Sequence, residues 1–259
     1  MISIVCYLVR FKKRSYVCKN LRIISGDSTG DSAKIKNVFI AFGKNHVDFF
    51  LSPLFNKAWV GRNVEFVGLD EVDEVLKKPS GAIFAAAHIG NWEMGCMVMA
   101  LLGYPVYTVF WKHKSSLVNG YFKKRRTQKG IKGIPLDRHV GAACIRALVD
   151  HNILAVAVDR NYGEEGESVS FFGTPVSLPR GAAVLALKTR VPIIPTFCIR
   201  KRDDSFLFKC CTPRYYDKEQ IHTENQVRYV MSDYIKIIEE NVREYQGQWS
   251  MFHDVFKKP

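Results

Sequence analysis

The sequence predicts an α/β fold in a single domain, with a mostly parallel or mixed central sheet, helices on both of its faces and an N-terminal helical appendage. Short apolar runs alternate with windows of helical periodicity from about residue 63 onward, which is the pattern of strand–helix–strand units. The chain has 259 residues, of which 47% are hydrophobic. This suffices for one large core and excludes a disordered or fibrous protein. No stretch of about 18 apolar residues occurs, so we expect no unaided membrane span.

The expected elements follow the chain in order. Six apolar runs are expected to be strands: Val64–Val67, Ala82–Ala87, Val106–Phe110, Ile153–Val158, Pro192–Ile199 and Phe206–Cys211. Helical periodicity is found in six windows: Ala33–Trp59, Trp92–Leu102, Val118–Lys129, Arg138–Asp150, Arg180–Thr189 and Asn225–Tyr245. The polar stretch 25–32 separates an apolar and basic N-terminal segment, residues 1–32, from the main domain, residues 33–259.

The charge is unevenly distributed. Lys and Arg number 38 against 25 Asp and Glu, giving a formal charge of +13. One basic cluster comprises Arg10, Lys12, Lys13, Arg14, Lys19 and Arg22, and a second comprises Lys112, Lys114, Lys123, Lys124, Arg125, Arg126, Lys129 and Lys132. Such clusters are either solvated faces or sites for an anionic partner, of which lipid and nucleic acid are the obvious classes. No nucleic-acid-binding motif accompanies them, so we expect no nucleic acid partner.

The first nine residues are apolar and are followed by the first basic cluster. A secretory signal has the reverse order of charge and apolar residues, and nine residues are too few to cross a bilayer. The segment therefore either lies at a membrane interface or packs on the domain as a first helix. Seven cysteines without a CxxC pair indicate reduced thiols in a protein that faces the cytosol.

The clearest candidate for catalysis is His88, which follows the strand expected at 82–87 and is followed after four residues by Glu93. Gly90 permits a sharp turn, and Asn91 is a good N-cap for a helix that begins at Trp92. Glu93 would then lie in the first helical turn and accept a hydrogen bond from one imidazole nitrogen, leaving the other as a general base. A structural histidine is the alternative that this spacing alone leaves open.

A second strand, 153–158, ends at Asp159 and Arg160. Asp159 either caps the following loop through Asn161 and Gly163 or takes part in the site. A metal site with the nearby glutamates is less favoured, because no oxygen-ligand loop pattern is present. Phe171 and Phe172 are candidates for an apolar groove or for the core.

These residues resemble the bacterial lipid A biosynthesis (lauroyl/myristoyl) acyltransferases, a family of the lysophospholipid acyltransferase superfamily. His88-Ile-Gly-Asn-Trp-Glu93 is similar to the signature of that family, His-x4-acid. Further similarities extend from about residue 10 to the C-terminal segment 248–256: Asn20-Leu-Arg22, Asn119 with Arg125-Arg126 and Gly130, Asp159-Arg-Asn-Tyr-Gly163, Phe171-Phe-Gly-Thr-Pro175 and Leu178–Pro195.

The resemblance implies a glycerolipid acyltransferase-like fold and transfer of an acyl group from a thioester, on acyl carrier protein or CoA, to a hydroxyl of an anionic lipid A-type glycolipid. His88 would be the base and Glu93 its orienting partner, with no cofactor, no metal and no acyl-enzyme. Substrate contacts are expected from Asn91, Asn119, Arg126, Asp159, Arg160, Gly163, Gly173 and Arg180. Donors to the oxyanion would be backbone amides near Gly90–Trp92 or one of the three arginines.

One feature differs from the pattern of this family, and a second differs from the glycerolipid branch of the superfamily. The apolar N-terminal segment is short, so the chain is expected to be peripheral or N-terminally anchored at the cytoplasmic face of the bacterial inner membrane. The Phe-Pro-Glu-Gly element of the glycerolipid branch is absent, which favours a glycolipid acceptor. Other glycolipids, lysophospholipids and a non-catalytic protein that binds anionic lipid or nucleic acid remain the alternatives.

Overall fold

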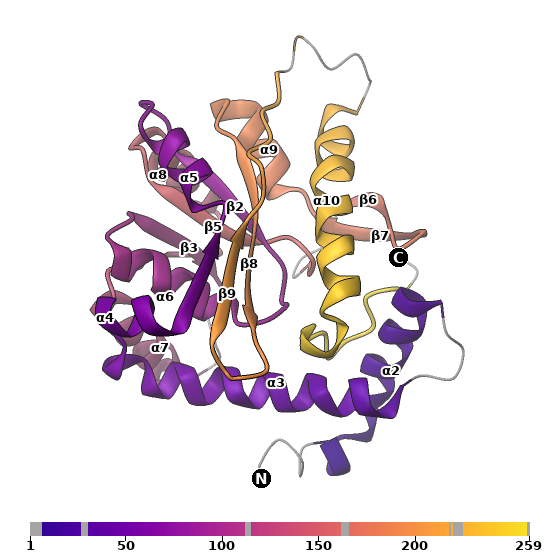
Figure 1. The fold of residues 1–259 in the computed structure, drawn as a ribbon. Coiled ribbons are helices and arrows are strands. Elements are labelled where there is room, and N and C mark those ends of the chain that lie inside the picture. The colour runs from indigo at the N-terminus through magenta and orange to yellow at the C-terminus, as the bar shows by residue number, and fades with distance from the viewer. Residues whose placement is uncertain are drawn as a thin grey trace.

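The computed structural model describes residues 7–26, 31–111, 115–161, 166–217, 219 and 225–257, and it confirms the predicted α/β architecture (Figure 1). Its central sheet has seven strands in the order β1-β9-β8-β2-β5-β3-β4. Their bounds are β1 Val64–Val67, β2 Ala82–Ala86, β3 Val106–Phe110, β4 Lys132–Pro135, β5 Ile153–Ala157, β8 Ile193–Arg200 and β9 Phe206–Cys210. Every neighbouring pair is parallel except β8 and β9, so the sheet is mixed and mostly parallel, as expected.

Helices cover both faces of this sheet. The α-helices are α2 Phe11–Ser25, α3 Ser32–Leu51, α4 Lys57–Asn63, α5 Leu69–Leu76, α6 Trp92–Leu102, α7 Ser116–Gln128, α8 Val140–Val149, α9 Gly181–Thr189 and α10 Gln226–Glu244. Short 3-10 helices, η1 Ser52–Leu54 and η2 Gln246–Gln248, follow α3 and α10. No helix in the described ranges is both long and apolar enough to cross a membrane.

Strand β2 shows how the chain divides its core between the two faces. Ile83 and Ala85 belong to a core with α2, α8, α9 and α10, whereas Ala82 and Phe84 belong to a core with α4, α5 and α6. This alternation is what a strand buried on both faces requires. Helix α3 runs along one end of both layers (Figure 1) and contributes to each of the two cores.

The N-terminal appendage is helical, as predicted. Helix α2 buries Val17, Leu21 and Ile24 in the first core. Of the apolar N-terminal segment, residues 1–6 lie outside the described part of the chain, and Leu8 and Val9 are exposed. The division of the chain into residues 1–32 and 33–259 stays a prediction.

The single helix expected over Ala33–Trp59 is wrong. Helix α3 ends at Leu51, because Pro53 in η1 cannot supply the amide that would continue it. A new helix, α4, then begins after Asn56, whose side chain accepts a hydrogen bond from the Trp59 amide at 2.9 Å.

An antiparallel hairpin, β6 Gly166–Phe171 and β7 Thr174–Pro179, stands apart from the main sheet. Its two-residue turn consists of Phe172 and Gly173, with φ of 51° and 74°. Positive φ at both positions is the geometry of a type I′ turn. Gly173, expected as a substrate contact, is therefore a turn residue in this hairpin.

Candidate functional site

His88 and Asp159 meet because their strands are neighbours in register. Strands β2 and β5 are parallel, and Ala86 pairs with Ala157. Each functional residue stands two positions beyond its strand end, so the two residues emerge side by side at the same edge of the sheet. One Asp159 oxygen, Oδ1, lies 2.7 Å from His88 Nδ1, and the other, Oδ2, accepts the His88 backbone amide at 2.8 Å.

Asp159 is completely enclosed. Its side chain is 0% exposed, and Trp249 Nε1 donates a third hydrogen bond to Oδ2 at 2.9 Å. Burial acts to raise the pKa of Asp159, but the charge of His88 and the hydrogen bonds from His88 and Trp249 outweigh it and lower the pKa. A carboxylate on Nδ1 favours the neutral tautomer in which Nε2 keeps its lone pair, as a general base requires.

Glu93 does not take the predicted place beside the imidazole. Helix α6 begins at Trp92 as expected, with the Asn91 side chain accepting the Met94 amide at 3.0 Å. Glu93 in its first turn faces α7, where Arg126 binds both carboxylate oxygens, with Nε at 3.1 Å from Oε2. The orienting contact expected from Glu93 is therefore made by Asp159, because a part-buried guanidinium is the stronger partner for this carboxylate.

The Glu93–Arg126 pair has a well-defined surrounding. The Arg126 guanidinium lies 5.6 Å from the ring centre of Phe110 and 5.5 Å from that of Phe122. Burial acts to lower the pKa of Arg126, but the Glu93 carboxylate outweighs it and raises the pKa. The pair is thus a charged wall of the site rather than a proton donor or acceptor.

Two backbone amides of the turn between His88 and α6 donate their hydrogen bonds to carbonyl groups of the protein. The Gly90 amide donates to the Gln248 carbonyl at 3.1 Å, and the Asn91 amide donates to the Cys198 carbonyl at 2.7 Å. The expectation that these two amides stabilise an oxyanion is therefore wrong. Gly90 has φ +61°, and a Cβ there would stand 2.1 Å from the Cys198 carbonyl oxygen, so only glycine fits this close approach.

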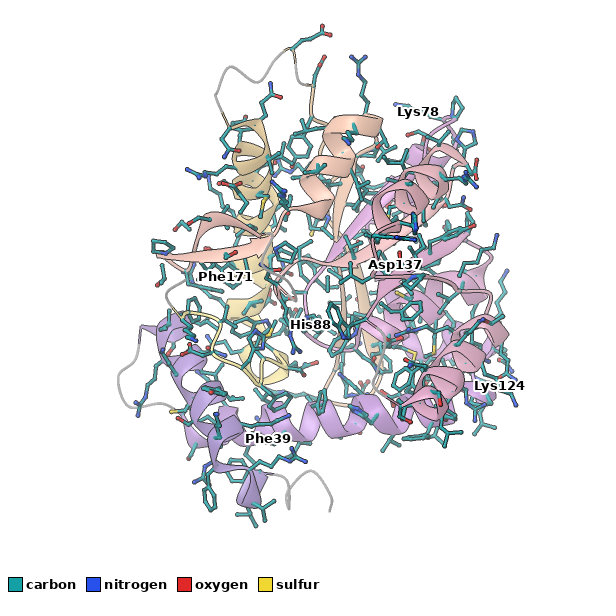
Figure 2. The ribbon with its side chains drawn as sticks, turned by 180° about the vertical axis from the view of Figure 1, so that it is seen from behind. Phe39, Lys78, His88, Lys124, Asp137 and Phe171 are labelled. Atoms are coloured by element: carbon teal, nitrogen blue, oxygen red, sulfur yellow. The ribbon has the colours of Figure 1, made fainter. Side chains whose placement is uncertain are left out.

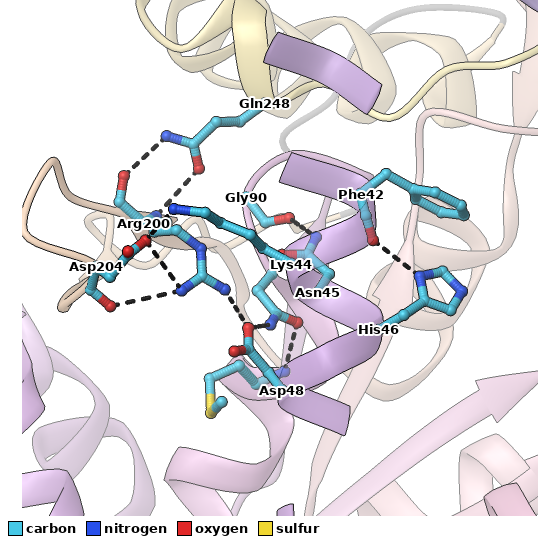
Figure 3. Close-up of polar contacts among 11 residues, drawn as sticks. Phe42, Lys44, Asn45, His46, Asp48, Gly90, Arg200, Asp204 and Gln248 are labelled. Carbon is cyan, nitrogen blue, oxygen red and sulfur yellow. Dashed lines mark hydrogen bonds and ion pairs between the residues drawn. The ribbon is translucent and has the colours of Figure 1, made fainter. Parts of the chain in front are cut away.

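A polar network supports this turn from below (Figure 3). The Asn91 side chain donates to Asp48 on α3 at 2.7 Å, and Arg200 at the end of β8 binds the same Asp48 oxygen. Asn45, one turn earlier on α3, donates to the Gly90 carbonyl at 2.6 Å. Asn91 is 2% exposed and has both ends of its amide engaged, so it positions the turn rather than presenting a group to a substrate.

His88 opens onto a cavity of about 1650 Å³. Figure 2 shows His88 near the middle of the molecule, between Phe171 in the β6–β7 hairpin and Lys124 on α7. Apolar side chains of α8 and α9 form one wall: Val140, Cys144, Ile145, Val184 and Leu185. The basic side chains among its described lining residues are Lys13, Lys123, Arg126, Arg160, Arg180 and Lys188, and the one carboxylate among those described residues is Glu93, which Arg126 already binds. The cavity thus combines apolar walls with a positive rim.

The sequence-predicted contacts are only partly brought together. Asn119, Arg126, Arg160 and Arg180 line the cavity with His88. Asp159 stands behind His88, and Gly163 lies outside the described residues.

Two further candidates of the sequence belong to the core. Phe171 and Phe172 are buried and pack against Trp249 and Phe256. Neither phenylalanine lines the cavity, so the core alternative holds for both.

Two cysteines line the cavity, and neither is an activated nucleophile. Burial raises the pKa of Cys96 to about 12 and that of Cys144 to about 11. Both therefore remain protonated thiols at neutral pH. A serine nucleophile on a Gly-x-Ser-x-Gly turn is also excluded. That spacing occurs at 26–30, between α2 and α3, whereas a nucleophile elbow joins a strand to a helix. Residues 27–30 themselves lie outside the described ranges.

Comparison with known proteins identifies the family of this chain. The family model for bacterial lipid A biosynthesis acyltransferases matches residues 2–258. The chain belongs to this family. The resemblance stated from the sequence is thereby confirmed, and the enzyme class of the family is the expected one, an acyltransferase.

The curated relatives are phosphatidylinositol mannoside acyltransferases. Two strains of Mycobacterium tuberculosis, CDC 1551 / Oshkosh and H37Rv, have proteins that are 28% identical over 163 residues, covering 61% of this chain and 52% of the relative. The protein of Mycolicibacterium smegmatis is 24% identical over 185 residues, covering 70% of this chain and 61% of the relative. The chain thus spans between half and two thirds of the length of these relatives.

Proposed function

We propose that this chain transfers a fatty acyl group from a thioester to a hydroxyl of a phosphate-bearing glycolipid, with His88 as the general base and Asp159 as its orienting partner. The carrying observation is the His88–Asp159 contact at the wall of a large apolar cavity with a basic rim. An imidazole held by an enclosed carboxylate suits removal of a hydroxyl proton. Apolar walls suit an acyl chain, and the basic rim suits an anionic head group.

The proposed reaction needs no acyl-enzyme. His88 Nε2 takes the proton of the acceptor hydroxyl as its oxygen attacks the thioester carbonyl carbon. The tetrahedral intermediate then collapses, the C–S bond breaks, and the leaving thiolate takes the proton back from Nε2. The positive charge that forms on the imidazole is stabilised by Asp159, whose pKa is lowered, so that it stays ionised throughout. The raised pKa of Cys96, about 12, disfavours a thioester relay through the protein.

The negative charge on the tetrahedral oxygen needs donors on the cavity wall. Arg160 follows Asp159 directly and lines the cavity, and Arg180 lines it at the start of α9. We assign these two arginines to the oxyanion and to the phosphate of the lipid.

The family name and the relatives support a glycolipid acceptor. The family is named for lipid A, and the relatives are named for phosphatidylinositol mannoside. We propose an acceptor of one of these two types, with lipid A the type that the family signature favours. The acyl donor would be acyl carrier protein or acyl-CoA, both of which are anionic. The protein would act at the cytoplasmic face of the bacterial inner membrane.

The test is acyl transfer by purified protein with a labelled acyl thioester, either donor, and detergent-solubilised lipid A precursor or phosphatidylinositol mannoside. Replacing a general base is expected to slow transfer by about 10²–10⁴-fold in His88→Ala. His139→Ala, an exposed histidine outside the cavity lining, is the matched control and is expected to keep the rate. Equal rates in wild type and His88→Ala would exclude His88 as the base. No transfer by the wild type with any pair would favour a lipid-binding protein without activity.

A further inference from the structure

Helix α3 carries a second apolar stripe that the core does not use. Val47, Phe50, Leu51 and Leu54 follow one another at spacings of three, one and three residues, which places them on one side of the helix and its 3-10 continuation. They are between 45% and 71% exposed. The buried stripe of α3, which ends in Asn45 and Phe49, lies on the other side.

Helix α7 continues this exposed surface. Leu117 is 85% exposed and Val118 is 39% exposed. One turn after Leu117, the ring centre of Tyr121 lies 5.4 Å from that of Phe50, and this contact joins α7 to α3. Lys129 Nζ fixes the far end of α7 by donating to the Phe55 carbonyl at 2.6 Å.

We call Val47, Phe50, Leu51, Leu54, Leu117 and Val118 the α3–α7 face. Scattered exposed apolar residues are ordinary, but a contiguous set on two adjoining helices marks an interaction surface.

The charge around the α3–α7 face has one sign. Residues 106–136, which include α7, contain eight Lys or Arg and no Asp or Glu. Lys123 and Lys124 are exposed on α7, and Figure 2 shows Lys124 at the outer edge of the molecule. The carboxylate of α3 in this region, Asp48, is turned inward onto Arg200 and Asn91.

The α3–α7 face shares a helix with the cavity wall. Ser116, Asn119, Gly120 and Lys123 line the cavity from α7, the helix that carries Leu117 and Val118. A molecule seated on the α3–α7 face would therefore contact a helix that also lines the cavity of His88.

We infer that the α3–α7 face is the surface by which this chain inserts shallowly into an anionic lipid bilayer. Apolar side chains flanked by lysines are suited to the boundary between acyl chains and anionic head groups, where lysine stems add apolar contact. This orientation brings α7, a helix that lines the cavity, to the lipid surface, where the acceptor would be found, and that consequence rests on the proposed function.

The first test is sedimentation with vesicles of phosphatidylcholine alone or mixed with phosphatidylglycerol. The variant Leu54→Glu/Leu117→Glu changes two exposed side chains and is compared with Tyr215→Glu/Tyr229→Glu, which changes two large side chains that are more than half exposed, at 57% and 55%, elsewhere on the surface. The variant loses two leucine side chains that the bilayer would bury, and this is expected to weaken binding to the anionic vesicles at least about tenfold. The control is expected to bind like the wild type. Equal binding by all three proteins would overturn the inference.

A second measurement separates this inference from the proposed function. Transfer to acceptor embedded in vesicles, divided by transfer to detergent-dispersed acceptor, is expected to fall about tenfold in Leu54→Glu/Leu117→Glu, in line with the lost binding. His88→Ala is expected to lose transfer in both media and to keep vesicle binding. A variant that binds vesicles normally but slows only with acyl carrier protein as donor, and not with acyl-CoA, would show that the face docks a protein and would overturn the inference. If the wild type transfers nothing, the sedimentation result alone still decides the surface.

Discussion

Asp159 holds His88 by its ring and by its backbone at the same time, with one carboxylate oxygen on Nδ1 at 2.7 Å and the other on the amide at 2.8 Å. Two contacts from one planar group fix the imidazole relative to the end of its own strand. Because Asp159 is itself fixed by the next strand and by Trp249, the direction of the imidazole is set by the sheet rather than by a loop.

Replacing Asp159 by Asn is expected to lower acyl transfer by about 10²–10⁴-fold, because an amide no longer enforces the tautomer with a free Nε2. The measurement is the transfer rate with a labelled thioester, with the fold checked by circular dichroism. A wild-type rate in a folded Asp159→Asn protein would show that this contact has no catalytic role.

Glu93→Gln is expected to act on stability. It leaves the part-buried Arg126 without its carboxylate, which costs about 3 kcal/mol of unfolding free energy. The double variant Glu93→Gln/Arg126→Met is expected to regain part of this loss, which a double-mutant cycle in denaturant measures. If Glu93→Gln instead slowed transfer as Asp159→Asn does, with unchanged unfolding free energy, Glu93 would be the orienting group after all.

Asp48→Ala is expected to destabilise the protein by about 3 kcal/mol, because Arg200, whose side chain is 10% exposed, loses its buried carboxylate. Lys44→Ala removes an exposed ion pair with Asp204 and is expected to cost at most about 0.5 kcal/mol. Chemical denaturation of both variants measures these losses of unfolding free energy. Equal costs for the two variants would mean that the network under the His88 turn contributes no more than a surface pair.

The stability of the protein is expected to fall between pH 6.5 and pH 4 through His253. Burial and the charge of Arg160 lower the pKa of His253 from 6.5 to about 4. Between these values the unfolded chain binds a proton that the folded protein does not, so the free energy of unfolding decreases as the pH falls. His253→Gln is expected to flatten this part of the profile, measured by thermal unfolding at several pH values. An unchanged slope in the variant would assign the acid sensitivity to other groups.

On the proposed function, we expect a larger side chain at Gly141 to alter the acyl preference. It lies in the wall formed by α8, and nothing stands within 4 Å of a Cβ built there. Gly141→Leu is expected to fill part of the cavity and shift the preference toward shorter acyl chains, measured with a series of thioesters. Gly61→Leu is the matched control, since Gly61 also lies in a helix with open space around it but outside the cavity lining. A chain-length profile that both variants share would place the acyl chain elsewhere.

Six of the seven strands of the main sheet could be predicted to within one residue at each end, because they are short, mostly apolar runs. Val64–Val67 and Val106–Phe110 are observed with the expected bounds. The apolar pattern does not predict α5, β4 or the β6–β7 hairpin, because these elements have few buried residues, which polar residues separate. Pro53 is the sequence signal for the break in the helix expected over 33–59. The prediction missed it because it used apolar periodicity alone.

At the site, the sequence pointed to His88 and to the helix that begins at Trp92, since both depend on local signals. It gave the wrong partner for the imidazole, because spacing along the chain favours a neighbour such as Glu93. The pairing of His88 with Asp159 depends on which strand lies beside β2, and equal offsets from two strand ends were the available signal. Trp249, Asp48 and Arg200 reach the site from distant elements, and no local pattern marks them.

His88, Asp159 and Trp249 are joined across sequence separations of 71 and 90 residues. Each of these closures orders a long loop, whose entropic cost is recovered only when the sheet and the C-terminal segment are both in place. The constellation therefore requires the sheet and the C-terminal segment to be in place together. A fragment that retains only β2 and α6 would contain the signature from His88 to Glu93 but would lack Asp159 and Trp249, which fix the orientation of the imidazole.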